Sequence, residues 1–290
     1  RQPDDHLLYS WLLHLLDGIP LSSFGYSLLT FLLIFSQASL LNRVFTAHKM
    51  MPRPNYLPAM SYLLISSLFR EWDQFSAALL VNSLLIWVYY RMLLLYNASR
   101  PGSAIFNIGL LIGLVTLLYQ PAVVFILLML FALFIMQPFH IRDWLIGLLG
   151  VTAPYYFLGI FLYLGGHGDW RQVIPLIRFS LPGMPQSVFT TIGIALLVIP
   201  FMVGGFYVQN NLNKMLIQVR KNWSLLLIFL IISMLIILVN GGNAYAKWIL
   251  CLVPLAGFHA AAYFYPNRQL FPRLLHWVLF AFAIYINYWS

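Results

Sequence analysis

The sequence predicts an all-α fold, a polytopic bundle of transmembrane helices, and three observations lead to it. Of the 290 residues, 62% are hydrophobic and 8% are charged, whereas a soluble domain has about a quarter of its residues charged. Apolar segments of bilayer-spanning length recur along the chain, and cations stand at their ends, where positive charge sets membrane orientation. We therefore expect residues 1–290 to form one integral-membrane domain, with membrane lipids as partners.

The first element is a short amphipathic segment, residues 6–17, preceded by the adjacent carboxylates Asp4 and Asp5. It is too short to span a bilayer, so we expect a helix that lies in the membrane interface. Asp4 or Asp5 is expected to be its N-cap. Apolar residues spaced by three and four share one face of this helix: Leu7, Leu8, Trp11, Leu12, Leu15 and Leu16.

The bundle itself, residues 24–288, contains about ten apolar segments that we expect to be helical spans. The second, fourth and fifth have about 15 residues, fewer than the ~20 that cross a bilayer core, so we expect half-spans, kinked pieces or helices that end beside a cavity. The segments are Phe24–Val44, Tyr56–Phe69, Phe75–Leu95, Ala104–Tyr119, Pro121–Met136, Trp144–Leu164, Val188–Gln209, Trp223–Asn240, Lys247–Tyr265 and Leu274–Tyr288.

The fourth and fifth segments are expected to form a tight hairpin. Gln120 and Pro121 mark its turn, because glutamine followed by proline interrupts a helical pattern. Gly109 and Gly113 form a GxxxG surface, which lets two helix backbones approach closely.

The charges predict the orientation of the chain. If the loops alternate between two sides, one side holds eleven cations and one acid, and the other holds five cations and six acids. The cation-rich side is expected to be cytoplasmic, which places the interfacial helix and Arg1 outside a bacterial inner membrane. An extracytoplasmic start requires either a cleaved signal peptide or an earlier helix that begins in the cytoplasm, and we expect a first helix before Arg1, which gives eleven spans in all.

Several function classes find no support in the sequence. The cations occur in ones to threes at the ends of apolar segments, a pattern of membrane orientation, so we expect no nucleic-acid partner. Cys251 is the only cysteine, which excludes an intrachain disulfide and a thiol metal cluster. Motifs for nucleotide hydrolysis, zinc proteolysis and serine hydrolase chemistry do not occur.

Three acidic segments on the outer side are the candidate site. If they converge on one cleft, their carboxylates can hold a divalent cation or act as a general base, while arginines bind a phosphate. Asp4 and Asp5 are the candidates for catalysis and for the metal. The candidates for substrate or phosphate binding are Arg70, Glu71, Asp73, Asp169, Arg171 and Arg178.

Each segment also has a simpler interpretation. Asp4 then only caps a helix, the Arg70–Asp73 segment is a salt-bridged turn with Trp72 anchored at the membrane interface, and Asp169 with Arg171 closes a loop.

Polar residues inside the spans are few. His259 is the sharpest of them, since an ionisable residue within a membrane span often marks a site. A lone neutral histidine more often makes an interhelical hydrogen bond, and Gln37, Asn82 and Asn240 invite the same interpretation. No aspartate or glutamate lies at mid-depth of a span, which disfavours a proton-coupled pump.

Two resemblances add to this picture. Through DDHLLYSWLL, NYLPAMSYLLISSLFREW and FNIGLLIGLVTLLYQPAVVFILLMLFALFIMQPFHIRDWLIGLLGVTAPYYF, nearly the whole chain resembles an uncharacterised family of multi-pass inner-membrane proteins of Gram-negative bacteria. That likeness implies a location and no activity.

The architecture is also similar to membrane glycosyltransferases of the C superfamily, which take sugars from polyprenyl-phosphate donors. RQPDDHLLYSWLLHLLDG is similar to their acidic outer loop before an interfacial helix, so Asp4 and Asp5 would match the acidic position. FNIGLLIGLVTLLYQPAVVFILLML and KWILCLVPLAGFHAAAYF are similar to a hairpin and a late helix of that superfamily. The 290 residues contain no large extracytoplasmic C-terminal domain and no acceptor-site motif, so an inactive relative is also compatible.

Three functions fit these features. The first is a glycosyltransferase-like scaffold that acts on a polyprenyl-phosphate-linked sugar at the outer leaflet. The second is a non-catalytic membrane subunit of an envelope or secretion complex, which contacts its partners through aromatic and GxxxG faces. The third is a lipid or solute transporter.

Overall fold

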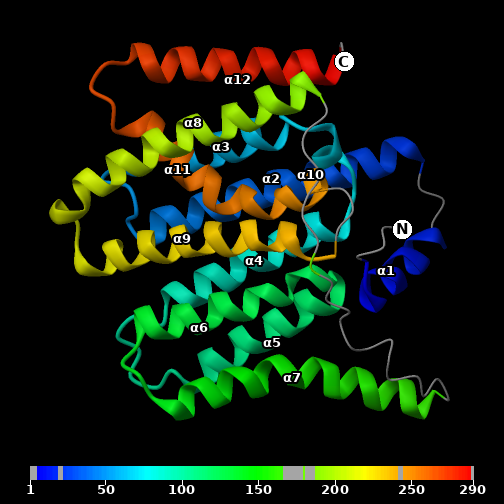
Figure 1. The fold of residues 1–290 in the computed structure, drawn as a ribbon. Coiled ribbons are helices and arrows are strands. Elements are labelled where there is room, and N and C mark those ends of the chain that lie inside the picture. The colour runs from blue at the N-terminus through cyan, green and yellow to red at the C-terminus, as the bar shows by residue number, and fades with distance from the viewer. Residues whose placement is uncertain (1–4, 19–21, 166–178, 180–186, 241–243, 289–290) are drawn as a thin grey trace.

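The computed structural model describes residues 5–18, 22–165, 179, 187–240 and 244–288, and the elements in these residues are all helical (Figure 1). Each of the ten predicted segments coincides with a helix or with consecutive helices. With η for 3₁₀ helices, the elements are α1 (Leu7–Asp17), α2 (Ser23–Ala47), α3 (Leu57–Ser66), η1 (Arg70–Asp73), α4 (Ala77–Leu93), α5 (Gly102–Leu118), η2 (Gln120–Val124), α6 (Phe125–Met136), α7 (Ile141–Leu164), α8 (Val188–Asn211), η4 (Leu212–Lys214), α9 (Ile217–Leu235), η5 (Ile236–Leu238), α10 (Ala244–Lys247), η6 (Trp248–Cys251), α11 (Leu252–Phe264) and α12 (Leu270–Tyr288).

Local sequence explains several helix boundaries. Ser22 caps α2 by accepting a hydrogen bond from the Gly25 amide, and Ser76 caps α4 through the Leu79 amide, so each serine satisfies a backbone donor that the first helical turn leaves unpaired. Pro121 lies in η2, which forms the predicted turn between α5 and α6, because proline cannot donate to a continuing α-helix.

Helix length separates the bundle into two groups. In the described residues, five helical segments are long and apolar enough to cross a membrane, which supports a membrane protein: α2, α7, α8 with η4, α9 with η5, and α12. The apolar helices of 10–17 residues are α3, α4, α5, η2 with α6, and η6 with α11. Short apolar helices are therefore present where the sequence predicted short segments, and α3, at about 1.5 Å per residue, is only about 15 Å long.

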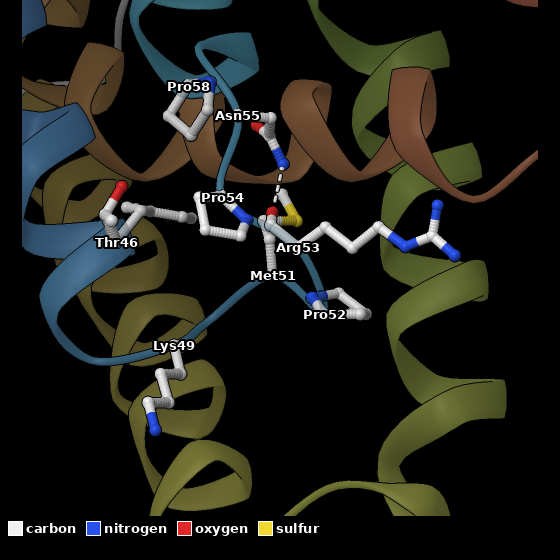
Figure 2. A pocket seen from close by; sticks show the side chains of 9 residues that line it. Thr46, Lys49, Met51, Pro52, Arg53, Pro54, Asn55 and Pro58 are labelled. Carbon is white, nitrogen blue, oxygen red and sulfur yellow. Dashed lines mark hydrogen bonds between the residues drawn. The ribbon is translucent and has the colours of Figure 1, made fainter.

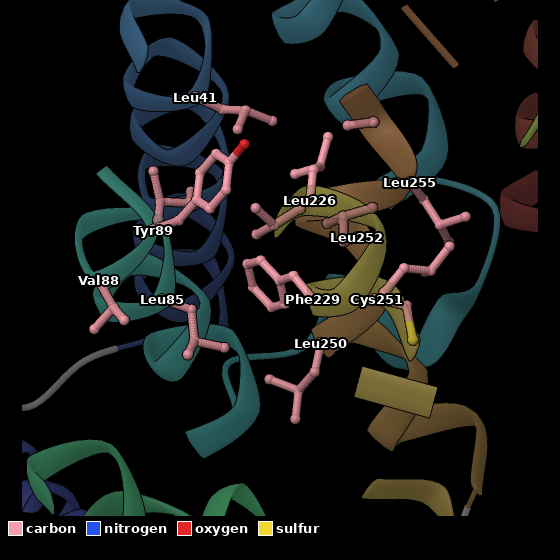
Figure 3. Packing of buried hydrophobic residues seen from close by; sticks show 14 of the residues in the cluster. Leu41, Leu85, Val88, Tyr89, Leu226, Phe229, Leu250, Cys251, Leu252 and Leu255 are labelled. Carbon is pink, nitrogen blue, oxygen red and sulfur yellow. The ribbon is translucent and has the colours of Figure 1, made fainter. Parts of the chain in front are cut away.

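Several of the short helices are largely buried, whereas most of the longer helices are mainly exposed; the exception is α9, which packs among the short helices α6, η6 and α11. α11 is buried from Leu252 through Tyr263, whereas α7 and α12 lie at opposite sides of the bundle (Figure 1). Figure 3 shows the central packing, where side chains such as Leu41, Tyr89 and Phe229 meet, and all three are fully buried. The outer helices expose large apolar side chains, as lipid-facing surfaces do.

The predicted GxxxG surface packs against α7. A Cβ atom built on Gly109 would lie 2.2 Å from the Gly147 carbonyl oxygen, and one on Gly113 would lie 2.5 Å from the Val151 carbonyl oxygen. The two helix backbones are thus in direct contact, which glycine alone permits. The prediction of close packing is confirmed, and it follows that this surface is buried within the chain and is not a face for a partner subunit.

Successive helices run in opposite directions, so the connections alternate between two ends of the bundle (Figure 1). We name these the acidic end, which includes α1, η1, η2 and α10, and the basic end, which includes the connections after α2, α4, α6, α8 and α11. The alternation assumed for the charges is therefore present. The basic end contains Arg43, Lys49, Arg53, Arg91, Arg100, Arg142, Asp143, Lys214, Arg220, Lys221, Arg268 and Arg273.

Candidate functional site

The start of α1 is attached to the end of α5. The His6 amide donates to the Leu118 carbonyl at 3.2 Å, and Asp5 forms an isolated antiparallel bridge with Tyr119. α1 begins at Leu7, and the His6 carbonyl accepts the first helical bond from Ser10. His6 therefore occupies the N-cap position of α1. The expectation of an N-cap at Asp5 is wrong, because Asp5 lies one residue further from the helix and its backbone pairs with Tyr119.

The body of α1 packs on the bundle through one side. Tyr9 is buried, and Leu12 and Leu13 pack against the main core. Trp11 is 36% exposed and Leu15 is 74% exposed, so part of the predicted apolar face points away from the protein.

Tyr9 connects α1 to the segment that follows η1. Its hydroxyl donates to the Phe75 carbonyl at 3.4 Å, and the two rings lie 6.2 Å apart. Burial raises the pKa of Tyr9, and the charge of Asp5 raises it further. The contact between Tyr9 and Phe75 holds α1 beside the residues that follow η1, so the Asp5 segment and η1 both lie at the acidic end.

η1 is held by its tryptophan. Trp72 is 0% exposed and its ring lies 4.7 Å from that of Phe69, so the expectation of an anchor at the membrane interface is wrong: the indole is buried inside the protein. Glu71 is half-buried, and Arg70 and Asp73 are exposed. Since Arg70 precedes the buried indole and Asp73 follows it, both stand at the surface of a fixed turn.

Asp73 has a higher pKa than an ordinary aspartate. The residue is exposed, but its carboxyl group lies close enough to the protein to lose part of its hydration, which raises its pKa from 3.8 to about 6, because desolvation disfavours the charged form. A carboxyl group with this pKa populates both protonation states near neutral pH, as a general acid or base requires.

His6 is a second polar group of the acidic end. It is 2% exposed, and neither ring nitrogen has a hydrogen-bond partner of normal geometry within the described part of the chain. Burial lowers its pKa, and the nearby Leu117 carbonyl offsets this in part. His6 is therefore a neutral buried imidazole beside Asp5.

The remaining outer candidates, Asp4, Asp169, Arg171 and Arg178, lie outside the described residues. Within the described part of the chain, no group of three histidine, cysteine, aspartate or glutamate side chains is arranged to hold a metal ion. The metal site expected at Asp4 and Asp5 therefore stays a prediction.

His259 is an interhelical hydrogen-bonding residue. It is 0% exposed in α11, and its Nε2 lies 2.9 Å from the Leu197 carbonyl of α8. Pro200 lies within α8 and interrupts the backbone hydrogen bonds of that helix near this contact, because proline has no amide proton to donate. The Nδ1 of His259 has no hydrogen-bond partner among the described residues, so only one of its two ring nitrogens joins the helices.

Gln37 and Asn82 also act between helices. Tyr62 donates its hydroxyl to the Gln37 carboxamide oxygen at 2.6 Å, and the Gln37 amide donates to the Leu79 carbonyl at 2.8 Å. Asn82 donates to the Ile249 carbonyl at 2.8 Å. These bonds join α2, α3, α4 and η6 inside the bundle, as expected for polar residues in membrane spans.

Sequence reasoning missed a pocket at the basic end, between the end of α2 and the start of α3 (Figure 2). It is lined by Thr46, Lys49, Arg53 and Asn55, among others. We interpreted these cations only as orientation signals. The signal that could have found the pocket is the proline-rich turn MMPRPNYLP, because closely spaced prolines hold a chain in an open, fixed conformation.

Comparison of the chain with protein-family models, with characterised proteins and with solved structures found no match.

Proposed function

We propose that this chain is a multi-pass protein of a bacterial inner membrane that acts on a polyprenyl-phosphate-linked sugar at the outer leaflet. The reacting groups of this proposal stand at the acidic end. The observation that carries it is the attachment of α1 to α5 and to Phe75, since this brings Asp5 to the same end of the bundle as Asp73.

Charge supports the orientation that the proposal needs. The basic end has eleven cations and one acid, Asp143, and the side richer in lysine and arginine stays in the cytoplasm. The acidic end then faces outward, at the level of the lipid headgroups, where the phosphate of a polyprenyl carrier lies.

The chemistry follows from the pKa of Asp73. In its ionised form the carboxylate accepts the proton of an acceptor hydroxyl while the oxygen of that hydroxyl attacks the anomeric carbon of the sugar. A new C–O bond forms as the bond between that carbon and the phosphate oxygen breaks. The polyprenyl phosphate leaves with the bonding electrons, and a guanidinium such as that of Arg70, in the same turn, stabilises its charge.

The test uses the purified protein in liposomes with a short-chain polyprenyl-phosphate-linked hexose as donor and glycerol, in excess, as the acceptor hydroxyl, and it measures released polyprenyl phosphate. We expect release by the wild type and its loss in Asp73→Asn and Asp5→Asn. Asp143→Asn removes the single acid of the opposite end and is the matched control, expected to keep wild-type activity.

Two results contradict the proposal. Equal release by all three variants places the reaction elsewhere. No release by folded wild-type protein, together with co-purification of the same membrane proteins from wild type and Asp73→Asn, favours the non-catalytic subunit instead.

A further inference from the structure

We propose that the turn between α2 and α3 is a binding site for a phosphate ester that carries a hydroxyl group, such as the headgroup of an anionic phospholipid. The site is at the basic end, opposite the acidic end, and it does not depend on the function proposed above. Four features of the turn support this site: its shape, its rigidity, its charge and one buried side chain with an unpaired oxygen, Asn42.

The shape is a pair of adjoining hollows. One has a volume of about 380 Å³ and the other about 660 Å³, so together they have the size of common small-molecule sites. Thr46, Pro54 and Asn55 line both hollows. A ligand with two parts can therefore occupy both, one on each side of Pro54.

The wall between the hollows is rigid. Pro52, Pro54 and Pro58 each fix one backbone angle of the turn. Asn55 accepts a hydrogen bond from the Leu57 amide at 3.0 Å and donates to the Arg53 carbonyl at 2.8 Å. This closes the turn on itself and shapes the entry into α3.

The turn is also anchored to the bundle. The Trp223 indole N–H of α9 donates to the Met50 carbonyl at 3.2 Å, and Met50 is 1% exposed. A shape that is fixed before binding loses little conformational entropy when a ligand enters.

The charge of the hollows is positive. Lys49 and Arg53 line the smaller hollow and Arg43 lines the larger one, while no carboxylate of the described residues lines either. In Figure 2, Lys49 and Arg53 extend from the turn in different directions. The start of α3 adds the positive end of a helix dipole next to Tyr56 and Ala59 of the larger hollow.

Asn42 is the buried side chain with the unpaired oxygen. It is 9% exposed and lines the larger hollow, and its carboxamide oxygen has no hydrogen-bond partner among the described residues. A buried acceptor without a donor costs free energy. The oxygen itself is covered, so a ligand hydroxyl reaches it, and removes that cost, when the carboxamide rotates toward the larger hollow. Cations for the phosphate and an acceptor for a hydroxyl thus define the ligand class.

The same chemistry can come from a lipid headgroup or from a soluble phosphate ester. The test therefore titrates purified full-length protein in neutral detergent with three probes: dihexanoyl phosphatidylglycerol, glycerol 1-phosphate, and dihexanoyl phosphatidylcholine, which has no free hydroxyl and no net charge. Binding is measured by microscale thermophoresis. Binding of phosphatidylglycerol but of neither other probe identifies a lipid site. Equal affinity for phosphatidylglycerol and glycerol 1-phosphate identifies a site for a soluble phosphate ester.

Matched variants separate the pocket from general surface charge. Arg43→Gln, Lys49→Gln and Arg53→Gln are combined in one variant, and Arg142→Gln, Lys214→Gln and Arg268→Gln in the other, which removes the same charge from the same end outside the hollows. We expect affinity about tenfold lower in the first variant, since each exposed charge contact contributes a few-fold. The second variant should bind like wild type.

Asn42→Ala tests the hydroxyl contact while all cations stay. It should weaken binding of phosphatidylglycerol several-fold, because a hydrogen bond to the ligand is lost. It also keeps the proposal testable if the triple pocket variant does not fold, which its melting temperature without ligand reveals. Equal loss of affinity in both triple variants, or binding of phosphatidylcholine as tight as that of phosphatidylglycerol, overturns the proposal.

Discussion

Two neighbouring glycines of α8 offer a direct test of helix packing. A Cβ atom on Gly204 would lie 1.9 Å from the Phe258 carbonyl oxygen of α11, whereas one on Gly205 would have no atom within 4 Å. The same substitution by alanine therefore creates a backbone clash at one position and enters open space at the next.

The magnitude follows from the overlap. A carbon–oxygen contact of about 3.3 Å is about 1.4 Å longer than the distance available at Gly204, so α8 and α11 must separate. Overpacking of this kind costs about 1–3 kcal/mol, while replacing glycine by alanine within a helix stabilises by about 1 kcal/mol. We expect Gly205→Ala to be about 2 kcal/mol more stable than Gly204→Ala.

The assay is thermal unfolding in detergent micelles at one scan rate, followed by tryptophan fluorescence. A difference of about 2 kcal/mol corresponds to a difference of about 4–8 °C between the two melting temperatures for a chain of this size. Equal melting temperatures would refute the close approach of α8 and α11, because helix propensity is the same for both variants.

Two further predictions concern single polar groups. Because burial raises the folded-state pKa of Asp73 to about 6, the folded state binds more protons than the unfolded state between about pH 4 and 6, and wild-type stability falls as pH rises through this window. The stability of Asp73→Asn should therefore match that of wild type at pH 4 and exceed it at pH 7.5 by about 1 kcal/mol, a value discounted for the exposure of this residue. A difference between the two melting temperatures that does not change with pH contradicts this. Tyr62→Phe removes the donor to Gln37 and should cost about 1 kcal/mol in the same unfolding assay, whereas Tyr285→Phe, on an exposed side chain of α12, should cost nothing; equal melting temperatures of these two variants would argue against the buried network.

Hydropathy predicted where the helices are, but it predicted some of their ends less well. The second segment was expected to reach Phe69, yet α3 ends at Ser66. The prediction ran too far because Leu68 and Phe69, which follow the helix, are also apolar and buried. α9 begins at Ile217 and not at Trp223, since cations at the membrane surface continue a helix without lowering its stability. Apolar character reports burial, and it does not report backbone hydrogen bonding.

The candidate site was predicted only in part for a related reason. Charge alone located Asp5 and Asp73, and the structure adds that α1 reaches the Phe75 carbonyl, a contact between residues 66 positions apart in the chain. The sequence did not single out Asn42 as a site residue, because the hollow that it lines is formed with Pro54 and Asn55, more than ten residues later in the chain. A polar residue in an apolar helix becomes informative only when its neighbours in space are known.

An outer-leaflet site at Asp5 and Asp73 requires the acidic end to face outward, and site-specific labelling tests this orientation most directly. Cys251, which is 4% exposed, is replaced by alanine, and single cysteines are introduced at Gln74, exposed beside η1, or at Tyr56, 82% exposed at the basic end. With a membrane-impermeant maleimide on intact bacterial cells, Gln74→Cys should react at once, and Tyr56→Cys should react only after the membrane is permeabilised. Reaction of Tyr56→Cys in intact cells, with Gln74→Cys protected, would contradict both the orientation and an outer-leaflet site at Asp5 and Asp73.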